Sequence, residues 1–97
     1  MDTHLYLTGA HVVLENETLK EAAVLIADGL IVAIDPASSG GAKEISLRGH
    51  TLMPGMIDLH CDALEKEAEP RPGVHFPFNF ACEQADKRNA AAGITTI

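Results

Sequence analysis

The chain has 97 residues, the length of one small domain, and a chain of this size buries only about 60 to 65% of its unfolded surface. Its 7 Lys and Arg against 14 Asp and Glu give a net charge of −7, which argues against nucleic-acid binding and against a polybasic membrane-binding surface. Hydrophobic residues make up 46% and charged residues 22%, a composition that excludes a disordered chain.

The first half of the chain is predicted to form a succession of short β-strands. Its apolar residues come in clusters separated by turn residues, without a long helical period. Asp28 and Gly29 predict a tight type I′ hairpin, because both central positions of that turn need a positive φ. Residues 35–41 are rich in Ser, Pro and Gly and predict a loop. The expected strands are His4–Thr8, His11–Leu14, Ala23–Ala27, Leu30–Ile34, Lys43–Leu47 and Thr51–Met53.

The pattern changes at Pro54, where a βαβ unit is predicted to begin. A short apolar strand at 56–60 is followed by an acidic and Pro-rich stretch. A helix comes next, which Asn79 is expected to cap and Gly93 to end. The β-branched residues 94–97 begin a second strand, expected to lie parallel to the first with a right-handed crossover.

Cysteine usage and the lack of targeting segments predict a cytoplasmic protein. The longest apolar run, residues 22–27, is far shorter than a membrane span, and residues 1–4 lack the features of a signal peptide. Cys61 and Cys82 have no paired spacing and are expected as free thiols in a reducing compartment. We therefore expect no nucleic-acid or membrane partner, and the sequence leaves a homo-oligomer open.

The candidate site is the segment 58–62, Asp-Leu-His-Cys-Asp. On a strand, His60 and Asp62 would share one face. An imidazole and a carboxylate two residues apart at the C-terminal end of a parallel strand can both reach one divalent cation. On spacing alone the simpler interpretation is favoured, with His60 as a hydrogen-bonded polar residue at a strand end and Asp62 as a helix cap, because His-x-Asp is a short and common pattern.

The flanking residues favour the metal site, because they resemble a known family. The run 54–60, Pro-Gly-Met-Ile-Asp-Leu-His, is similar to the P-G-x-I-D-x-H signature of the amidohydrolase superfamily, in which the first barrel strand delivers two metal ligands. The runs 60–66, 69–74 and 90–96 resemble the phosphonate-metabolism branch of that superfamily, which carries His-x-Asp at this place.

The resemblance implies both a fold and an activity. The fold is α/β, with residues 1–53 as a small β-sandwich portion and residues 54–97 as the first βαβ unit of a (β/α)8 TIM-type barrel, truncated after its second strand. The activity is that of a metal-dependent hydrolase that releases pyrophosphate from a ribose 5-triphosphate carrying a phosphonate, a small phosphorylated substrate. His60 and Asp62 would supply part of the ligand set of a divalent metal, with zinc as the expected ion. Arg71, between two prolines, would present a rigid fork to a substrate phosphate, and a surface Arg packed on those prolines is the alternative.

Several alternatives stay open. Ala63 and Ala85 depart from the branch pattern, so another phosphorylated substrate is conceivable. A (β/α)8 barrel needs about 250 residues, so the remaining ligands and the general base are expected outside this chain. No catalytic residue is therefore assigned, and the 97-residue chain alone is expected to be inactive. The alternative functions are another amidohydrolase, such as a deaminase or deacetylase, and a non-catalytic β-rich interaction module.

Overall fold

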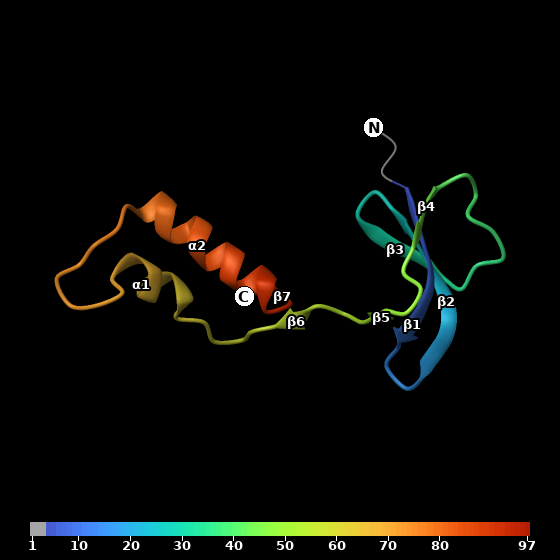
Figure 1. Ribbon diagram of the computed structural model, residues 1–97, viewed down its shortest axis with the longest axis horizontal. Helices are drawn as coiled ribbons and strands as arrows, with labels where there is room; N and C mark the ends of the chain where they lie inside the picture. Colours follow the sequence, from blue (N-terminus) through green and yellow to red (C-terminus); the bar gives the residue numbers. More distant parts are fainter. Residues whose placement is uncertain (1–3) are drawn as a thin grey trace. The chain divides into compact units, whose positions relative to one another are not determined.

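The computed structural model describes residues 4–97. These residues divide into two compact units, unit 1 up to Pro54 and unit 2 from Gly55 to Ile97. Unit 1, blue to green in Figure 1, is built of strands, and unit 2, yellow to red, contains both helices. Within the described residues, no helix has the length and apolar character needed to cross a membrane.

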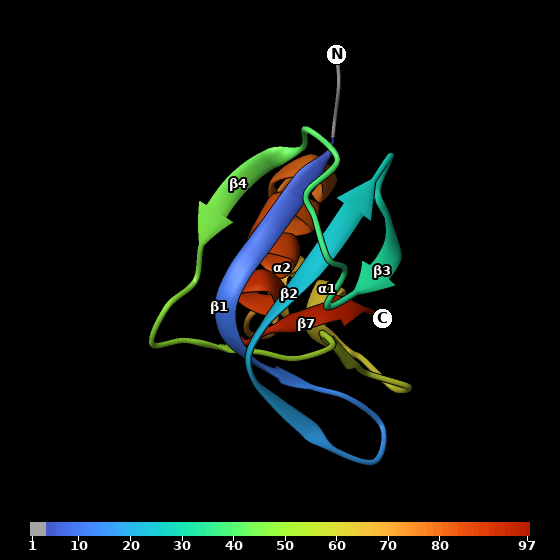
Figure 2. The same ribbon diagram turned by 90° about the vertical axis from the view of Figure 1, so that its right-hand side faces the viewer.

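Unit 1 is a five-stranded sheet centred on β1 (Leu5–Val13). Along one edge of β1 runs the antiparallel β2 (Thr18–Ala27), which in turn pairs antiparallel with β3 (Leu30–Ile34). The other edge of β1 pairs in parallel first with β4 (Lys43–Ser46) and then with β5 (Thr51–Leu52). Figure 2 shows the order β3-β2-β1-β4 across the sheet.

The prediction of two separate strands at the start of unit 1 is wrong, because β1 runs through both of them. Gly9 has a φ of 77°, and the register with β2 shifts between Leu7 and Ala10 and again between Ala10 and Val12. Gly9 therefore forms part of a β-bulge, which bends the strand without ending it. The next strand also starts earlier than predicted, at Thr18.

The predicted hairpin is confirmed. Asp28 and Gly29 have φ values of 51° and 78°, so both central residues of the turn are in the left-handed region, as a type I′ turn requires. The strand that follows, β3, has the predicted bounds.

Short side chains form the core of unit 1. Ala10, Val12, Ala22 and Val24 are buried together, with larger hydrophobic residues half-buried around them. Next to this core lies an apolar groove of about 300 Å³, which extends to Ile31 and other residues of β1, β3 and β5. One sheet with a small core thus leaves much of its apolar surface exposed.

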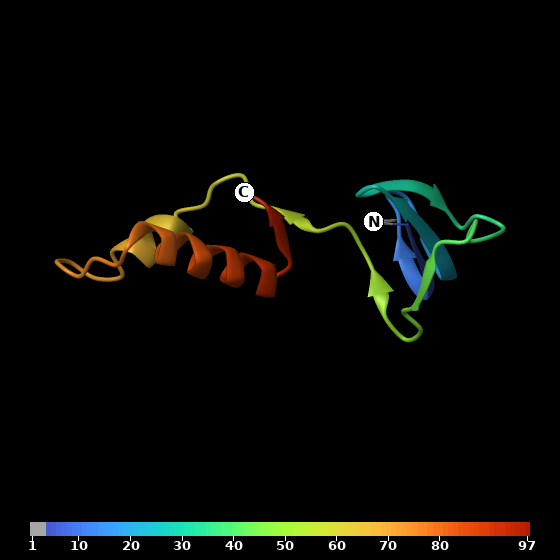
Figure 3. The same cartoon turned by 90° about the horizontal axis from the view of Figure 1, so that it is seen from above.

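Unit 2 contains β6 (Met56–Ile57), α1 (Ala63–Ala68), α2 (Phe78–Ala91) and β7 (Ile94–Thr96). β6 and β7 pair in parallel, as predicted. Figure 3 shows α1 alongside α2, and β7 returning to β6 after α2. The first strand is shorter than the predicted span 56–60, and α1 follows Asp62, where only the simpler interpretation placed a helix cap.

The helix α2 begins and ends for different reasons. Pro77, not the predicted Asn79, occupies its N-cap position. The rings of Phe76 and Phe80 lie 5.4 Å apart, so the residue before the cap packs on the first turn of the helix. At the other end, Gly93 directly follows the cap residue with a φ of 79°, and the prediction that it ends the helix is confirmed.

Candidate metal site

His60 and Asp62 lie in the loop that joins β6 to α1, and a turn brings them together. The strand ends at Ile57, so the predicted alternation along a strand does not place them. Instead, the His60 N–H donates a hydrogen bond to Asp58 Oδ1 at 3.1 Å. The imidazole Nε2 of His60 then lies 3.6 Å from Asp62 Oδ1. The structure therefore brings the two predicted ligands together, by a route different from the predicted one.

The separation of these two donor atoms suits a single divalent cation. Two ligands bound at about 2.1 Å by a tetrahedral metal are about 3.4 Å apart, close to the 3.6 Å between His60 Nε2 and Asp62 Oδ1. Both side chains are accessible, at 88% and 57% exposure. A cluster of three or more candidate ligands is not found among residues 4–97. The pair could therefore supply two donors to a metal ion, and its role as ligands stays a prediction.

Asp62 also occupies the position that the simpler interpretation gave it. It is the N-cap residue of α1, but within the described part of the chain its side chain makes no capping hydrogen bond. Its backbone carbonyl accepts a hydrogen bond from the Lys66 N–H at 3.2 Å. The carboxylate is therefore not engaged by the helix and stays available to a cation.

Arg71 lies in a separate turn. Val74 N donates to Arg71 O at 3.1 Å, and Gly73 between them has a φ of 78°. Figures 1 and 3 place the segment 69–77 beyond α1, at the end of unit 2 away from β6 and β7. Among the described residues no contact joins Arg71 to the predicted ligand pair, so its role as a phosphate-binding residue stays a prediction.

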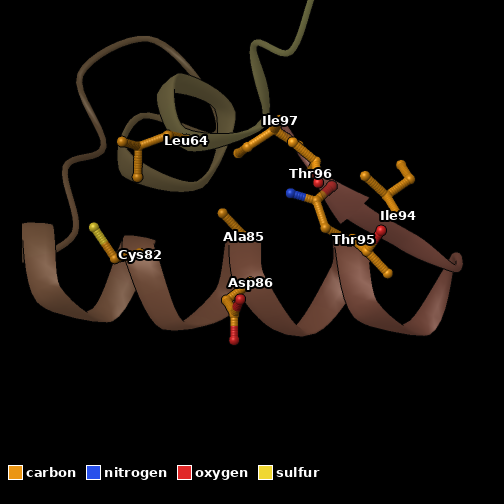
Figure 4. A pocket seen from close by; sticks show the side chains of 9 residues that line it. Leu64, Cys82, Ala85, Asp86, Ile94, Thr95, Thr96 and Ile97 are labelled. Carbon is orange, nitrogen blue, oxygen red and sulfur yellow. The ribbon is translucent and has the colours of Figure 1, made fainter. Parts of the chain in front are cut away.

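The sequence did not predict a cavity of about 290 Å³ between α1, α2 and β7. Figure 4 shows Leu64 of α1 and Ile97 beside the space over α2, and Asp86 directed away from α1. Cys82 also lines this cavity, and it and Cys61 are free, as predicted. The only signal in the sequence was the helical spacing of the small residues on α2. The candidate ligand pair does not line this cavity.

Comparison with known proteins finds relatives of one family. Over 93 residues, 96% of the chain, it is 33% identical to alpha-D-ribose 1-methylphosphonate 5-triphosphate diphosphatase of Escherichia coli (strain K12). Over 87 residues, 88% of the chain, it is 32% identical to dihydroorotase of Staphylococcus aureus (strain N315). The chain spans only 24% of the length of the first relative and 19% of the second. Both relatives are hydrolases of the amidohydrolase family.

The fold also has a counterpart among solved structures. A crystal structure of an uncharacterised protein superimposes on 96% of this chain with a TM-score of 0.62, at 24% sequence identity, and the match covers 25% of that protein. No protein-family model matches the chain. The predicted likeness to amidohydrolases is confirmed by these homologues, and the mixed α/β arrangement with a sheet-rich N-terminal unit agrees with it.

Proposed function

We propose that this chain is the N-terminal part of a metal-dependent amidohydrolase-type enzyme that hydrolyses a ribose 5-triphosphate carrying a phosphonate and releases pyrophosphate. The observation that carries the proposal is the His60–Asp62 pair, whose donor atoms lie 3.6 Å apart just after a strand that pairs in parallel with β7. The similarity to the diphosphatase, over 96% of this chain, supports the substrate class.

In this proposal, β6 and β7 are the first two strands of a (β/α)8 barrel, and unit 1 is part of a small sandwich. Barrel enzymes build their active sites at the carboxyl ends of the strands, which is where the loop after β6 carries the ligand pair. The further ligands and the general base would come from later strands, so the 97 residues alone would be inactive. Two free cysteines support a reducing, cytoplasmic location, and the mass of the native parent enzyme in solution tests whether it forms a homo-oligomer.

His60 and Asp62 would hold a divalent cation, with zinc as the ion we propose. His60 would contribute Nε2 in the neutral imidazole form. The Asp62 carboxylate adds a negative charge that favours retention of the cation. A bound divalent cation supplies polarisation of the scissile phosphoryl group and activation of water. Arg71 would bind a phosphate oxygen through its planar guanidinium.

The test uses the polypeptide that contains this chain, expressed from its own gene and measured first by intact mass. We expect a mass well above that of 97 residues and release of pyrophosphate from the triphosphate substrate. His60→Ala should lose most of the bound metal and the activity. His50→Ala is the matched control, because His50 is an exposed histidine at a turn of unit 1 and its side chain bonds to a neighbouring residue, to Arg48 O at 3.2 Å.

Two results would contradict the proposal. Stoichiometric metal retained in His60→Ala would remove the ligand assignment. Pyrophosphate release by the isolated 97-residue chain would show that the site is complete without further strands.

The 32% identity to dihydroorotase over 87 residues favours a second candidate, an amidohydrolase that opens a C–N bond. The same purified protein distinguishes the two: hydrolysis of dihydroorotate or a related cyclic amide, without pyrophosphate release from the triphosphate, would establish the second candidate in place of the first.

A further inference from the structure

Gly55 lies where any side chain would collide with β7. A Cβ atom at this position would overlap Cγ2 and Oγ1 of Thr95 and would lie 2.7 Å from its Cβ, a distance that real Cβ atoms do not adopt. Gly55 is not among the glycines with a positive φ, so its backbone conformation is open to any residue. The contact with Thr95, and not the backbone conformation, therefore requires glycine at this position.

Thr95 is the extra residue at an irregularity in the β6–β7 pairing. Met56 lies opposite Ile94, and Ile57 lies opposite Thr96. Over this stretch β7 contributes three residues against two from β6. The hydroxyl of Thr95 lies 3.5 Å from the carbonyl oxygen of Met56, so its side chain is turned toward the start of β6.

Hydrogen bonds at both ends of β6 hold it on β7. At one end the Met56 N–H donates to Gly93 O, and at the other the Asp58 N–H donates to Thr96 O, both at 2.9 Å. β6 has only two residues. A displacement of its first residue is therefore expected to move the whole strand. Any group inserted between Gly55 and Thr95 would push the strands apart and lengthen both of these hydrogen bonds.

From Asp58 the contacts continue to the candidate ligand pair. Its N–H is held by Thr96 O, and its Oδ1 accepts the hydrogen bond from the His60 N–H. His60 then places its Nε2 against Asp62 Oδ1. The backbone position of β6 on β7 is thereby transmitted to the two donor atoms through three successive contacts.

We propose that Gly55 and Thr95 form a positioning pair for the metal site. The lack of a side chain at Gly55 lets β6 pack directly on Thr95, and this close approach sets the place from which His60 and Asp62 meet one divalent cation. Among the described residues no contact joins either member of the pair to His60 or Asp62, so both act through the backbone of β6. The inference deepens the proposed function and depends on it only for the identity of the ligands.

The test measures Zn²⁺ affinity of the 97-residue chain by titration, together with amide spectra and amide hydrogen exchange of the metal-free protein. Gly55→Ala should shift the amide signals of residues 58–62 before any metal is added and should weaken Zn²⁺ binding about tenfold, the usual effect of disturbing residues that support metal ligands. Adding Thr95→Gly should reverse both changes, because it removes every Thr95 side-chain atom that the new methyl group meets. Thr95→Gly alone removes the contact without creating an overlap, so it should weaken Zn²⁺ binding less than Gly55→Ala does.

The outcomes separate this inference from the proposed function. Unchanged amide signals and unchanged Zn²⁺ affinity in Gly55→Ala would overturn the positioning role, even while His60→Ala still abolishes Zn²⁺ binding. A His60→Ala variant that binds Zn²⁺ as the parent does would overturn the proposed function, and the metal-free amide signals would still decide the role of Gly55. If Gly55→Ala fails to fold, recovery of both fold and affinity in the double variant supports the inference, and a double variant that stays unfolded or weak overturns it.

Discussion

Two valine-to-alanine substitutions in unit 1 remove the same atoms from neighbouring strands, and the structure predicts different losses of stability for them. Val24 of β2 is 3% exposed and belongs to the buried cluster with Ala10 and Val12. Val32 of β3 is 54% exposed. Because the substitution is the same and both sites are strand positions, the change in strand propensity is similar in the two variants. The difference between the two losses of stability therefore measures the contribution of side-chain burial.

The magnitude follows from the groups removed. Val24→Ala deletes two buried carbon groups, which at about 0.8 kcal/mol each gives about 1.6 kcal/mol, and the incompletely filled space raises this to about 2 kcal/mol. Val32→Ala, scaled by its burial, should cost about 0.7 kcal/mol. In a unit of this size 1 kcal/mol corresponds to about 4 to 8 °C in Tm, so the two melting temperatures should be clearly separated.

The chain offers a probe that follows unit 1 alone. It contains one tyrosine and no tryptophan, and Tyr6 lies in β1 with its hydroxyl donating to Pro36 O at 3.3 Å. Urea unfolding followed by tyrosine fluorescence therefore reports on the sheet of unit 1. Equal losses of stability in Val24→Ala and Val32→Ala would refute the reasoning, because burial would then not control the stability of this sheet.

Three further predictions concern a turn, an ion pair and the ligand loop. Gly29→Ala should destabilise unit 1 by about 1 kcal/mol in the same assay, because a residue with a Cβ is strained at a φ of 78°; an unchanged midpoint would contradict the type I′ turn. Arg88→Gln removes the 2.6 Å ion pair between Arg88 Nε and Glu67 Oε1, which joins α2 to α1, and should lower the stability of unit 2, followed by helical circular dichroism, by at most about 1 kcal/mol, less at high salt; a loss that does not change with salt would exclude an electrostatic cause. Asp58→Ala should speed hydrogen exchange of the His60 amide about fivefold, the equivalent of about 1 kcal/mol for its hydrogen bond. In Asp58→Asn the acceptor is kept, so the same amide should exchange at nearly the rate of the unchanged chain. Equal exchange rates in the two variants would argue against this bond.

The prediction that His60 and Asp62 lie close together is confirmed, but by a geometry that differs from the predicted one. The strand alternation that placed His60 and Asp62 on one face does not apply, because β6 ends before either of them. The hydrogen bond from the His60 N–H to Asp58 Oδ1 and the start of α1 bring them within 3.6 Å. The spacing was informative because turns, like strands, can bring residues i and i+2 together.

Residues adjacent in sequence determined the local structure of this protein. Asp28 and Gly29 form the hairpin turn and Gly93 ends α2, as predicted. Few residue types adopt a positive φ readily, so the residues that do so mark these turns in the sequence itself.

Only the tertiary structure decided what depends on distant partners. Gly9 has the same conformational freedom as Gly29, yet it forms a bulge inside β1, because β2, β4 and β5 pair with the strand on both sides of it. The contact that forbids a side chain at Gly55 comes from Thr95, far along the chain. A steric restriction of this kind exists only after β6 and β7 have paired, so no pattern of neighbouring residues can encode it.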